Sequence, residues 1–367
     1  MTTTTSRLAP SFLPATAVLE MTYRCNHRCG FCSCPWFASG GGYALRSEMG
    51  VAEWQAAVDR LARMGVCNLT FTGGEALLKD GLFDIIRHAA RCTVEHIETR
   101  AGVLVSEFKP PNLYLISNGT TVTPQALEFC RELGVQLSMS LPGLMTLREH
   151  TGIGHPDDIL GKFRAAQALG MKTVVNVTVT KRNLHELYQT ISAAFLAGAQ
   201  QLLLNRFLPG GRGLDHPDWV LDADEVRTML DIAEEALTDA GRFGSVGTEL
   251  PRCIVDPRKY KRITVGTRCS AALGFFVVGP AGMLRVCNHS PVDLVHVTEL
   301  PALKTHPYWR RFTQRDYLPK KCAGCASVVD CDGGCREAAH VVGGSVDSPD
   351  PLLTECADCL GPIRGYG

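Results

Sequence analysis

The stretch Cys25-Asn-His-Arg-Cys29-Gly-Phe-Cys32 places three cysteines close together, directly after an apolar run at residues 17–21. A tight loop at the end of a strand can bring three thiolates to one metal ion or cluster. Three thiolates leave a four-iron cluster one protein ligand short, so one iron stays open to a small molecule. A zinc loop is the alternative, although zinc sites usually pair two Cys-x-x-Cys halves.

The spacing of these cysteines, with Phe31 beside the last of them, resembles that of the radical S-adenosylmethionine (SAM) enzymes. The resemblance implies that the open iron is chelated by the amino and carboxylate groups of SAM. It also implies that the reduced cluster cleaves SAM to a 5′-deoxyadenosyl radical, which removes hydrogen from a substrate C–H bond.

Overall composition excludes several other classes of protein. Lys plus Arg and Asp plus Glu are both 37 in 367 residues, which argues against broad binding to nucleic acid or to an anionic membrane. No apolar run reaches the roughly 18 residues of a membrane span, and the first residues lack the apolar core of a signal peptide. We therefore expect a cytoplasmic protein.

The sixteen cysteines are unevenly distributed. They crowd the start of the chain and its last third, and only Cys67, Cys92 and Cys130 lie between, as expected for single buried thiols. Disulfides require an oxidising compartment, and no export signal is visible. Clustered cysteines in a cytoplasmic chain favour ligation of metal or iron–sulfur clusters.

Strand and helix patterns alternate about six times, which predicts an α/β fold with a parallel sheet. Strands are expected at residues 17–21, 67–72, 112–117, 135–141, 173–179 and 201–207, and helices at 47–64, 79–91, 124–133, 157–169, 184–197 and 222–240. The radical SAM resemblance makes this a partial (β/α)6 parallel barrel. We expect a flexible tail at 1–14, the core at 15–245 and a cysteine-rich domain at 246–367. Residues 93–111 are expected to form a small hairpin around Gly102, with no assigned role.

Polar motifs follow the predicted strands, where the chemistry of parallel sheets collects. Gly73-Gly74-Glu75 resembles the GGEP motif of the radical SAM family, with Ala76 in place of Pro. The resemblance implies glycines that let the backbone approach the ligand and a Glu75 carboxylate that accepts from the methionine ammonium. Asn118, Ser140 and Asn176 match positions near SAM's ribose or methionine part, and each is equally consistent with an ordinary polar residue at a strand end.

The last third resembles the SPASM domain, a seven-cysteine extension that holds two auxiliary four-iron clusters. By this resemblance the first auxiliary cluster takes Cys269, Cys287 and Cys335, and the second takes Cys322, Cys325, Cys331 and Cys356. Cys253 is expected to complete the first cluster, which otherwise has an open iron. Cys359 is spare or competes with Cys356. Two zinc ribbons are the alternative. In total we expect SAM and three [4Fe-4S] clusters.

SPASM relatives mostly modify peptides or proteins, so we expect a ribosomal peptide as the substrate, modified by a crosslink, dehydrogenation or epimerisation. Sulfatase-maturing members carry an Asp base directly after the cysteine that matches Cys287. Asn288 cannot be a carboxylate base, which makes a sulfatase-type maturase a less favoured alternative. An epimerase would need a hydrogen donor, for which Cys34 and Cys359 are the candidates.

The expected partners are a reductant such as flavodoxin or ferredoxin and, because only about 15 residues precede the first strand, a separate leader-peptide-binding protein. Two other functions remain open. One is dehydrogenation of a small alcohol or sugar in a biosynthetic pathway. The other is a non-catalytic iron–sulfur electron carrier, against which the Gly73-Gly74-Glu75 motif argues because a carrier needs no SAM pocket.

Overall fold

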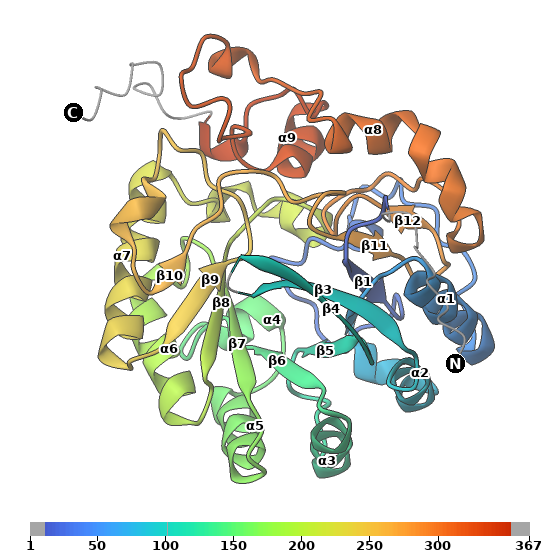
Figure 1. Ribbon diagram of the computed structural model, residues 1–367. Coiled ribbons are helices and arrows are strands. Elements are labelled where there is room, and N and C mark those ends of the chain that lie inside the picture. Colours follow the sequence, from blue (N-terminus) through green and yellow to red (C-terminus); the bar gives the residue numbers. More distant parts are fainter. Residues whose placement is uncertain (1–11, 101, 354–367) are drawn as a thin grey trace.

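The computed structural model describes residues 12–100 and 102–353. Most of the expected tail, together with Cys356 and Cys359, lies outside these residues. A ten-stranded sheet runs through the molecule in the order β10-β9-β8-β7-β6-β5-β2-β1-β11-β12 (Figure 1). Its strands are β1 (Thr16–Glu20), β2 (Asn68–Thr72), β5 (Asn112–Ser117), β6 (Gln136–Ser140), β7 (Thr173–Val179), β8 (Gln201–Arg206), β9 (Phe243–Val246), β10 (Ile263–Thr264), β11 (Phe276–Val278) and β12 (Leu284–Arg285).

Every pairing in this sheet is parallel except that of β11 with β12. The six neighbours β1, β2, β5, β6, β7 and β8 form the predicted (β/α)6 unit, so the predicted fold class is confirmed. Along β7, buried residues alternate with half-buried ones, as expected where both faces of a parallel sheet are covered.

Helices cover the outer side of the curved sheet (Figure 1). They are α1 (Val51–Arg63), α2 (Leu82–Ala89), α3 (Pro124–Leu133), α5 (Pro156–Ala168), α6 (Leu187–Leu196) and α7 (Ala223–Asp239), with the short α4 (Leu147–Thr151) at the cavity end of the sheet. In α1, Trp54, Val58 and Leu61 recur at helical spacing and are fully buried, which explains why this segment docks on the sheet.

The C-terminal third packs against the open end of the sheet and also extends the sheet itself. Strand β11 pairs in parallel with β1, so that Ala17 lies beside Phe276. Gly282 turns the chain from β11 into β12 at a φ of +78°, and a Cβ there would lie 2.3 Å from His296 Nε2. Helices α8 (Pro307–Thr313) and α9 (Arg336–Gly343) follow. Because β9 continues the sheet at residue 243, the domain division at residue 245 stays a prediction.

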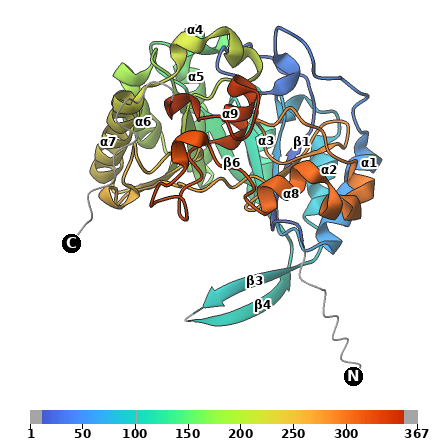
Figure 2. The ribbon, with the colours of Figure 1, turned by 90° about the horizontal axis from the view of Figure 1, so that it is seen from above.

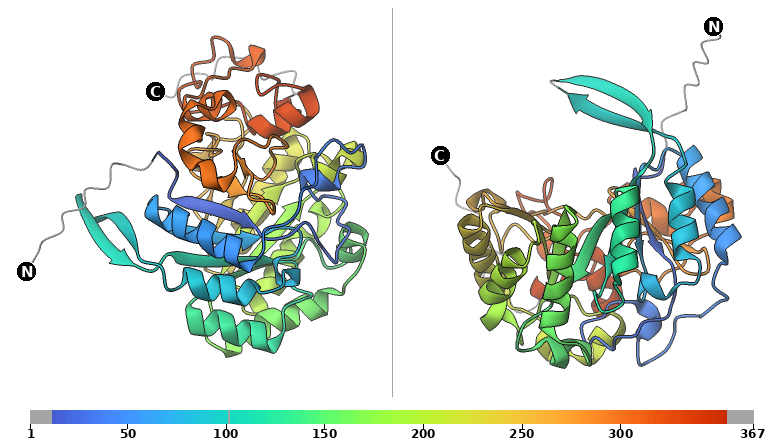
Figure 3. Two further views of the ribbon diagram at one scale, coloured as in Figure 1. Left: turned by 90° about the vertical axis from the view of Figure 1, so that its right-hand side faces the viewer. Right: turned by 90° about the horizontal axis from the view of Figure 1, so that it is seen from below.

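The expected hairpin is present and projects away from the rest of the molecule (Figures 2 and 3). It consists of β3 (Val94–Arg100) and β4 (Val103–Lys109), which pair in antiparallel fashion as a separate two-stranded sheet. Ile97, Leu104 and Phe108 are exposed along it.

Candidate active site

A single cavity of about 410 Å³ lies at the carboxyl ends of the parallel strands. It brings together the candidate residues that the sequence placed in three separate motifs. Its wall includes Cys25, Cys29, Cys32, Cys34, Gly73, Gly74, Glu75, Asn118, Ser140, Asn176, Cys269, Cys287 and Cys335.

The cysteine loop after β1 is fixed by backbone hydrogen bonds. The amides of Arg28 and Gly30 donate to the carbonyls of Thr151 and His150 at 3.1 and 2.9 Å. The Cys32 amide donates to the Cys29 carbonyl at 3.2 Å, which closes the loop on itself. Burial raises the pKa of Cys25 and Cys29, and the neighbouring thiols of the same loop raise these values further. Two thiols whose ionisation is disfavoured in this way suit a site completed by positive metal charge. Cys32 differs, because its hydrogen bond with Cys34 lowers its pKa.

Gly73 and Gly74 clamp the second motif onto the backbone that leads into Cys25. The Gly74 amide donates to the Thr22 carbonyl, and the Glu75 amide donates to the Arg24 carbonyl, both at 2.8 Å. A Cβ on Gly74 would lie 2.1 Å from the Arg24 carbonyl oxygen. The expected reason for these glycines was close approach to a ligand; the described contacts show close approach to the strand-end backbone.

Glu75 is 1% exposed and links two strand ends. Its carboxylate accepts hydrogen bonds from the Ser117 hydroxyl at 2.9 Å, the Asn118 amide at 2.8 Å and the Leu77 amide at 3.2 Å. Burial raises the pKa of Glu75 and outweighs these hydrogen bonds, which lower it. The carboxylate therefore organises the loops around the cavity, and its contact with an ammonium stays a prediction.

Asn118 connects the third motif to the cysteine loop. Its side-chain Nδ2 donates to Asn26 Oδ1 at 2.8 Å, and its Oδ1 accepts from the Thr120 hydroxyl at 2.6 Å. Asn176 accepts from Asn205 Nδ2 at 2.9 Å, and Ser140 lies on the cavity wall. These contacts place all three residues at the site without showing what they bind.

Cys34 lies on the cavity wall beside Cys32. Its Sγ is 3.8 Å from the Gly73 carbonyl, to which the thiol donates. The hydrogen bond with Cys32 and burial hold the pKa of Cys34 well above its ordinary value, so this thiol keeps its proton. A retained S–H is what a hydrogen-atom donor requires, whereas the second candidate donor, Cys359, lies outside the described residues.

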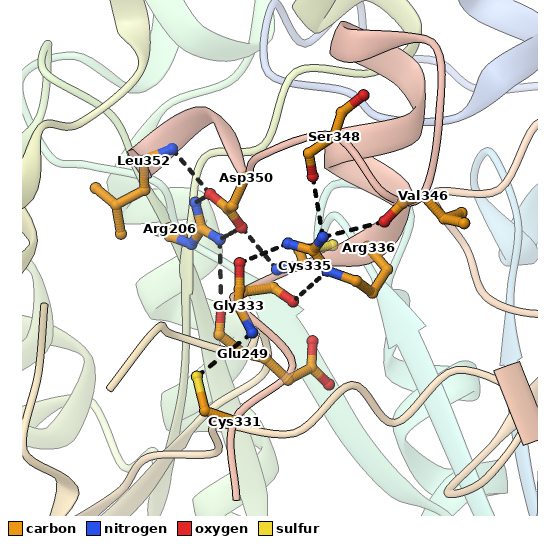
Figure 4. A network of polar contacts seen from close by, with 11 residues as sticks. Arg206, Glu249, Cys331, Gly333, Cys335, Arg336, Val346, Ser348, Asp350 and Leu352 are labelled. Carbon is orange, nitrogen blue, oxygen red and sulfur yellow. Dashed lines mark hydrogen bonds and ion pairs between the residues drawn. The ribbon is translucent and has the colours of Figure 1, made fainter. Parts of the chain in front are cut away.

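Three cysteines of the last third face the same cavity, and we call them the inner set: Cys269, Cys287 and Cys335. Carboxylates hold two of their backbone amides. The Cys269 amide donates to Asp332 at 2.6 Å. The Cys335 amide donates to Asp350, also at 2.6 Å (Figure 4). These charge-assisted hydrogen bonds fix the backbone from which the Cys269 and Cys335 side chains project.

Three other cysteines form an outer set away from the cavity: Cys322, Cys325 and Cys331. The structure places Cys253 beside them, because the amide of the adjacent Arg252 donates to the Cys331 sulfur at 3.4 Å. This differs from the expectation that Cys253 joins the first auxiliary set. The sequence pattern upstream of Cys269 offered no signal for this placement.

The sulfur spacing bears on the choice between zinc and a larger cluster. With Zn–S bonds of about 2.3 Å, the sulfurs of a tetrahedral zinc site lie only about 3.8 Å apart. Within residues 12–100 and 102–353, only Asp59, His88 and Cys92 bring three ligand atoms within 4.8 Å of one another. No three cysteine sulfurs of the described residues lie within that distance of one another, so this part of the chain contains no preformed cysteine site of zinc dimensions.

The sequence analysis missed a buried ion pair on the cavity wall. Glu20, the last residue of β1, pairs with Arg285 of β12 and accepts from Asn288 Nδ2 at 3.1 Å. Both charged side chains are at most 2% exposed. Desolvation raises the pKa of Glu20. Asn288 thus faces the cavity but is tied to Glu20. The sequence signal that could have revealed this pair is Glu20 itself, a carboxylate at the end of an apolar strand.

Comparison with known proteins agrees with this site. Residues 19–194 match the family model of the Radical SAM superfamily. An AdoMet-dependent heme synthase of Methanosarcina barkeri is 26% identical, covering 94% of this chain and 97% of that protein. A PqqA peptide cyclase of Rhodopseudomonas palustris is 25% identical, covering 96% and 88%.

Two solved structures share the fold. Streptococcus suis SuiB bound to precursor peptide SuiA has a TM-score of 0.70 at 14% identity, over 94% of this chain and 76% of that one. Native anSMEcpe with bound AdoMet has a TM-score of 0.66 at 15% identity, over 92% and 93%. The prediction of a radical SAM protein similar to peptide-modifying maturases is confirmed. No helix in the described part of the chain is long and apolar enough to cross a membrane.

Proposed function

We propose that this chain is a radical SAM enzyme that removes hydrogen from a C–H bond of a peptide substrate. The observation that carries the proposal is the shared cavity, which has the Cys25, Cys29 and Cys32 loop on one wall and the inner cysteine set on another. When bound, a [4Fe-4S] cluster at the first loop and SAM would supply the 5′-deoxyadenosyl radical.

The residues of the chain would position SAM and the substrate and exclude water from the cavity. Glu75 locks the ends of β2 and β5 together, and Asn118 ties them to the cysteine loop. The methionine part of SAM would lie against Gly73, Gly74 and Glu75, and its ribose near Ser140 and Asn176. A rigid wall of this kind holds substrate and SAM in register, so that the radical reaches one hydrogen only.

The inner set gives the cavity a second redox-capable wall. Cys269, Cys287 and Cys335 would hold one auxiliary cluster, to which the substrate radical can pass its electron. Removal of one hydrogen atom and one electron, with loss of a proton, is a net two-electron oxidation. A crosslink or dehydrogenation fits this balance without a separate oxidant.

The substrate class rests on the relatives. A PqqA peptide cyclase resembles this chain over most of its length, and SuiB, crystallised with a precursor peptide, shares its fold. A reductant such as flavodoxin or ferredoxin would supply electrons in the cytoplasm, and a separate protein would present the leader peptide. A small-molecule substrate is the second candidate, favoured by the heme synthase that aligns over 97% of its own length.

The test incubates reduced, cluster-loaded protein and SAM with short peptides encoded beside its gene, in deuterium oxide. Mass spectrometry that shows a loss of two hydrogens supports a crosslink or dehydrogenation. A gain of one dalton supports epimerisation, with Cys34 as the donor. Unmodified peptides together with turnover of a small metabolite would replace the peptide proposal by the second candidate.

A further inference from the structure

The outer cysteines lie on one loop between α8 and α9. The Cys325 amide donates to the Cys322 carbonyl at 3.1 Å, and the Gly333 amide donates to the Cys331 sulfur at 3.4 Å. A Cβ on Gly333 would lie 3.0 Å from the Cys322 sulfur, so the loop folds tightly over its own thiols. These three thiols need one more ligand to complete a four-iron cluster.

A second segment, nearly 80 residues earlier in the chain, reaches this loop. The Arg252 amide donates to the Cys331 sulfur at 3.4 Å, and the Arg252 guanidinium lies 3.4 Å from the Asp330 carboxylate. The turn that carries these groups is closed by a hydrogen bond from the Ile254 amide to the Pro251 carbonyl at 2.9 Å. Cys253 is therefore held next to Cys331, because both the backbone and the side chain of the adjacent Arg252 contact the outer loop.

The thiol of Cys253 is in the electrostatic field of all three outer cysteines. Cys331, Cys322 and Cys325 all act on it, and the amide of the adjacent Arg252 donates to the Cys331 sulfur. The inner cysteines, by contrast, neighbour one another: Cys335 acts on the pKa of Cys269, and both act on that of Cys287. The seven described cysteines from Cys253 onward thus divide into an inner group of three and an outer group of four.

We propose that Cys253 is the fourth protein ligand of the outer iron–sulfur cluster, with Cys322, Cys325 and Cys331. The inference rests on the proposed function, in that it takes the cysteine-rich region to hold clusters. It assigns to Cys253 the place that the sequence pattern gave to Cys356. Cys356 and Cys359 are then not required for either auxiliary cluster to assemble.

Differential alkylation of the loaded wild-type protein tests this assignment without relying on activity. Anaerobic protein is treated with light iodoacetamide, then denatured, stripped of iron and labelled with the heavy reagent. Because the Cys253 residue is exposed, iodoacetamide can reach its thiol when no cluster is bound. We expect Cys253 to carry the heavy label to the same extent as Cys331, and Cys356 and Cys359 to carry the light label. After iron is removed by chelation first, Cys253 should carry the light label.

Iron content of variants gives the second readout. Cys253→Ala should lower the count from about 12 per chain by up to about four, whereas Cys356→Ala combined with Cys359→Ala should leave it unchanged. Light label on Cys253 while Cys322 and Cys331 stay protected, or full iron in Cys253→Ala, would overturn this inference alone. Light label on all inner and outer cysteines would overturn the proposed auxiliary clusters and this inference together.

Discussion

Arg206, at the end of β8, forms a bidentate ion pair with Asp350, and the two side chains are 2% and 0% exposed. Arg206 Nη1 and Nη2 lie 3.0 and 2.5 Å from the two carboxylate oxygens (Figure 4). The same carboxylate accepts the amide of Cys335. One buried pair therefore joins the parallel sheet to the inner cysteine set.

Asp350→Asn should destabilise the protein by about 3–5 kcal/mol, because it leaves the Arg206 charge buried without a partner. Anaerobic urea unfolding measures the free energy. Asp84→Asn is the matched control: it breaks the exposed Asp84–Arg87 pair and should cost less than about 1 kcal/mol. Equal effects of the two changes would show that the buried pair does not hold the two regions together.

Gly74→Ala should displace the chain that leads into Cys25, since the added methyl meets the Arg24 carbonyl. We expect a loss of up to four of about 12 irons per chain and a lower melting temperature. Gly161→Ala, in the middle of α5 with open space around it, should keep all the iron and stabilise by up to about 1 kcal/mol. A fully loaded Gly74→Ala protein would contradict the clamp described for this loop.

Glu75→Gln should weaken SAM binding while the clusters remain, because the amide loses the negative charge that a methionine ammonium would meet. The single Gln oxygen can still accept from the Asn118 amide, and the new NH2 group can donate to the Ser117 hydroxyl, so most of the loop contacts are kept while the charge is removed. Isothermal titration under anaerobic conditions measures the affinity, and we expect a loss of at least about tenfold. Wild-type affinity in the variant would exclude Glu75 from the ammonium site.

His340 should make stability depend on pH. Its hydrogen bond to Glu337, 3.0 Å long, raises the pKa of His340 above its ordinary value near 6.5. The folded protein thus binds this proton more tightly than the unfolded chain does. The contribution is present below pH 6.5 and is lost as the pH rises through the folded-state pKa.

We therefore expect the free energy of unfolding to fall more steeply between pH 6.5 and 8.5 in the wild type than in His340→Gln. The extra loss in the wild type should be below about 1 kcal/mol. His185→Gln, at an exposed position, serves as the control and should follow the wild type. Identical pH profiles for wild type and His340→Gln would show that the Glu337 contact does not bind the proton more tightly.

Most of the fold could be predicted from local sequence patterns. Strands β5 and β7 and helix α3 were predicted to the residue, because apolar periodicity and turn residues act within one segment. Strands β9 to β12 were not predicted. Each has four residues or fewer, and β11 is specified by pairing with β1 some 260 residues away, which leaves no local signal.

The candidate site likewise has parts that the sequence predicted and parts that it did not. Short spacings identified the cysteine loop and the Gly-Gly-Glu motif, the SPASM resemblance indicated the inner cysteines, and the structure brings all of these to one cavity. The pairs Glu20–Arg285 and Arg206–Asp350 were missed because their partners are far apart in sequence. The position of Cys253 beside the outer loop depends on tertiary contacts of Arg252 for the same reason.

Reductive cleavage of SAM tests the central claim most directly. Anaerobic, dithionite-reduced protein is incubated with SAM, and 5′-deoxyadenosine is measured by liquid chromatography and mass spectrometry. We predict that the wild type forms 5′-deoxyadenosine, while Cys29→Ala, which removes one of the three thiols at the first loop, forms none above the protein-free control. Absence of 5′-deoxyadenosine from fully loaded wild-type protein, or equal amounts from Cys29→Ala, would contradict the account.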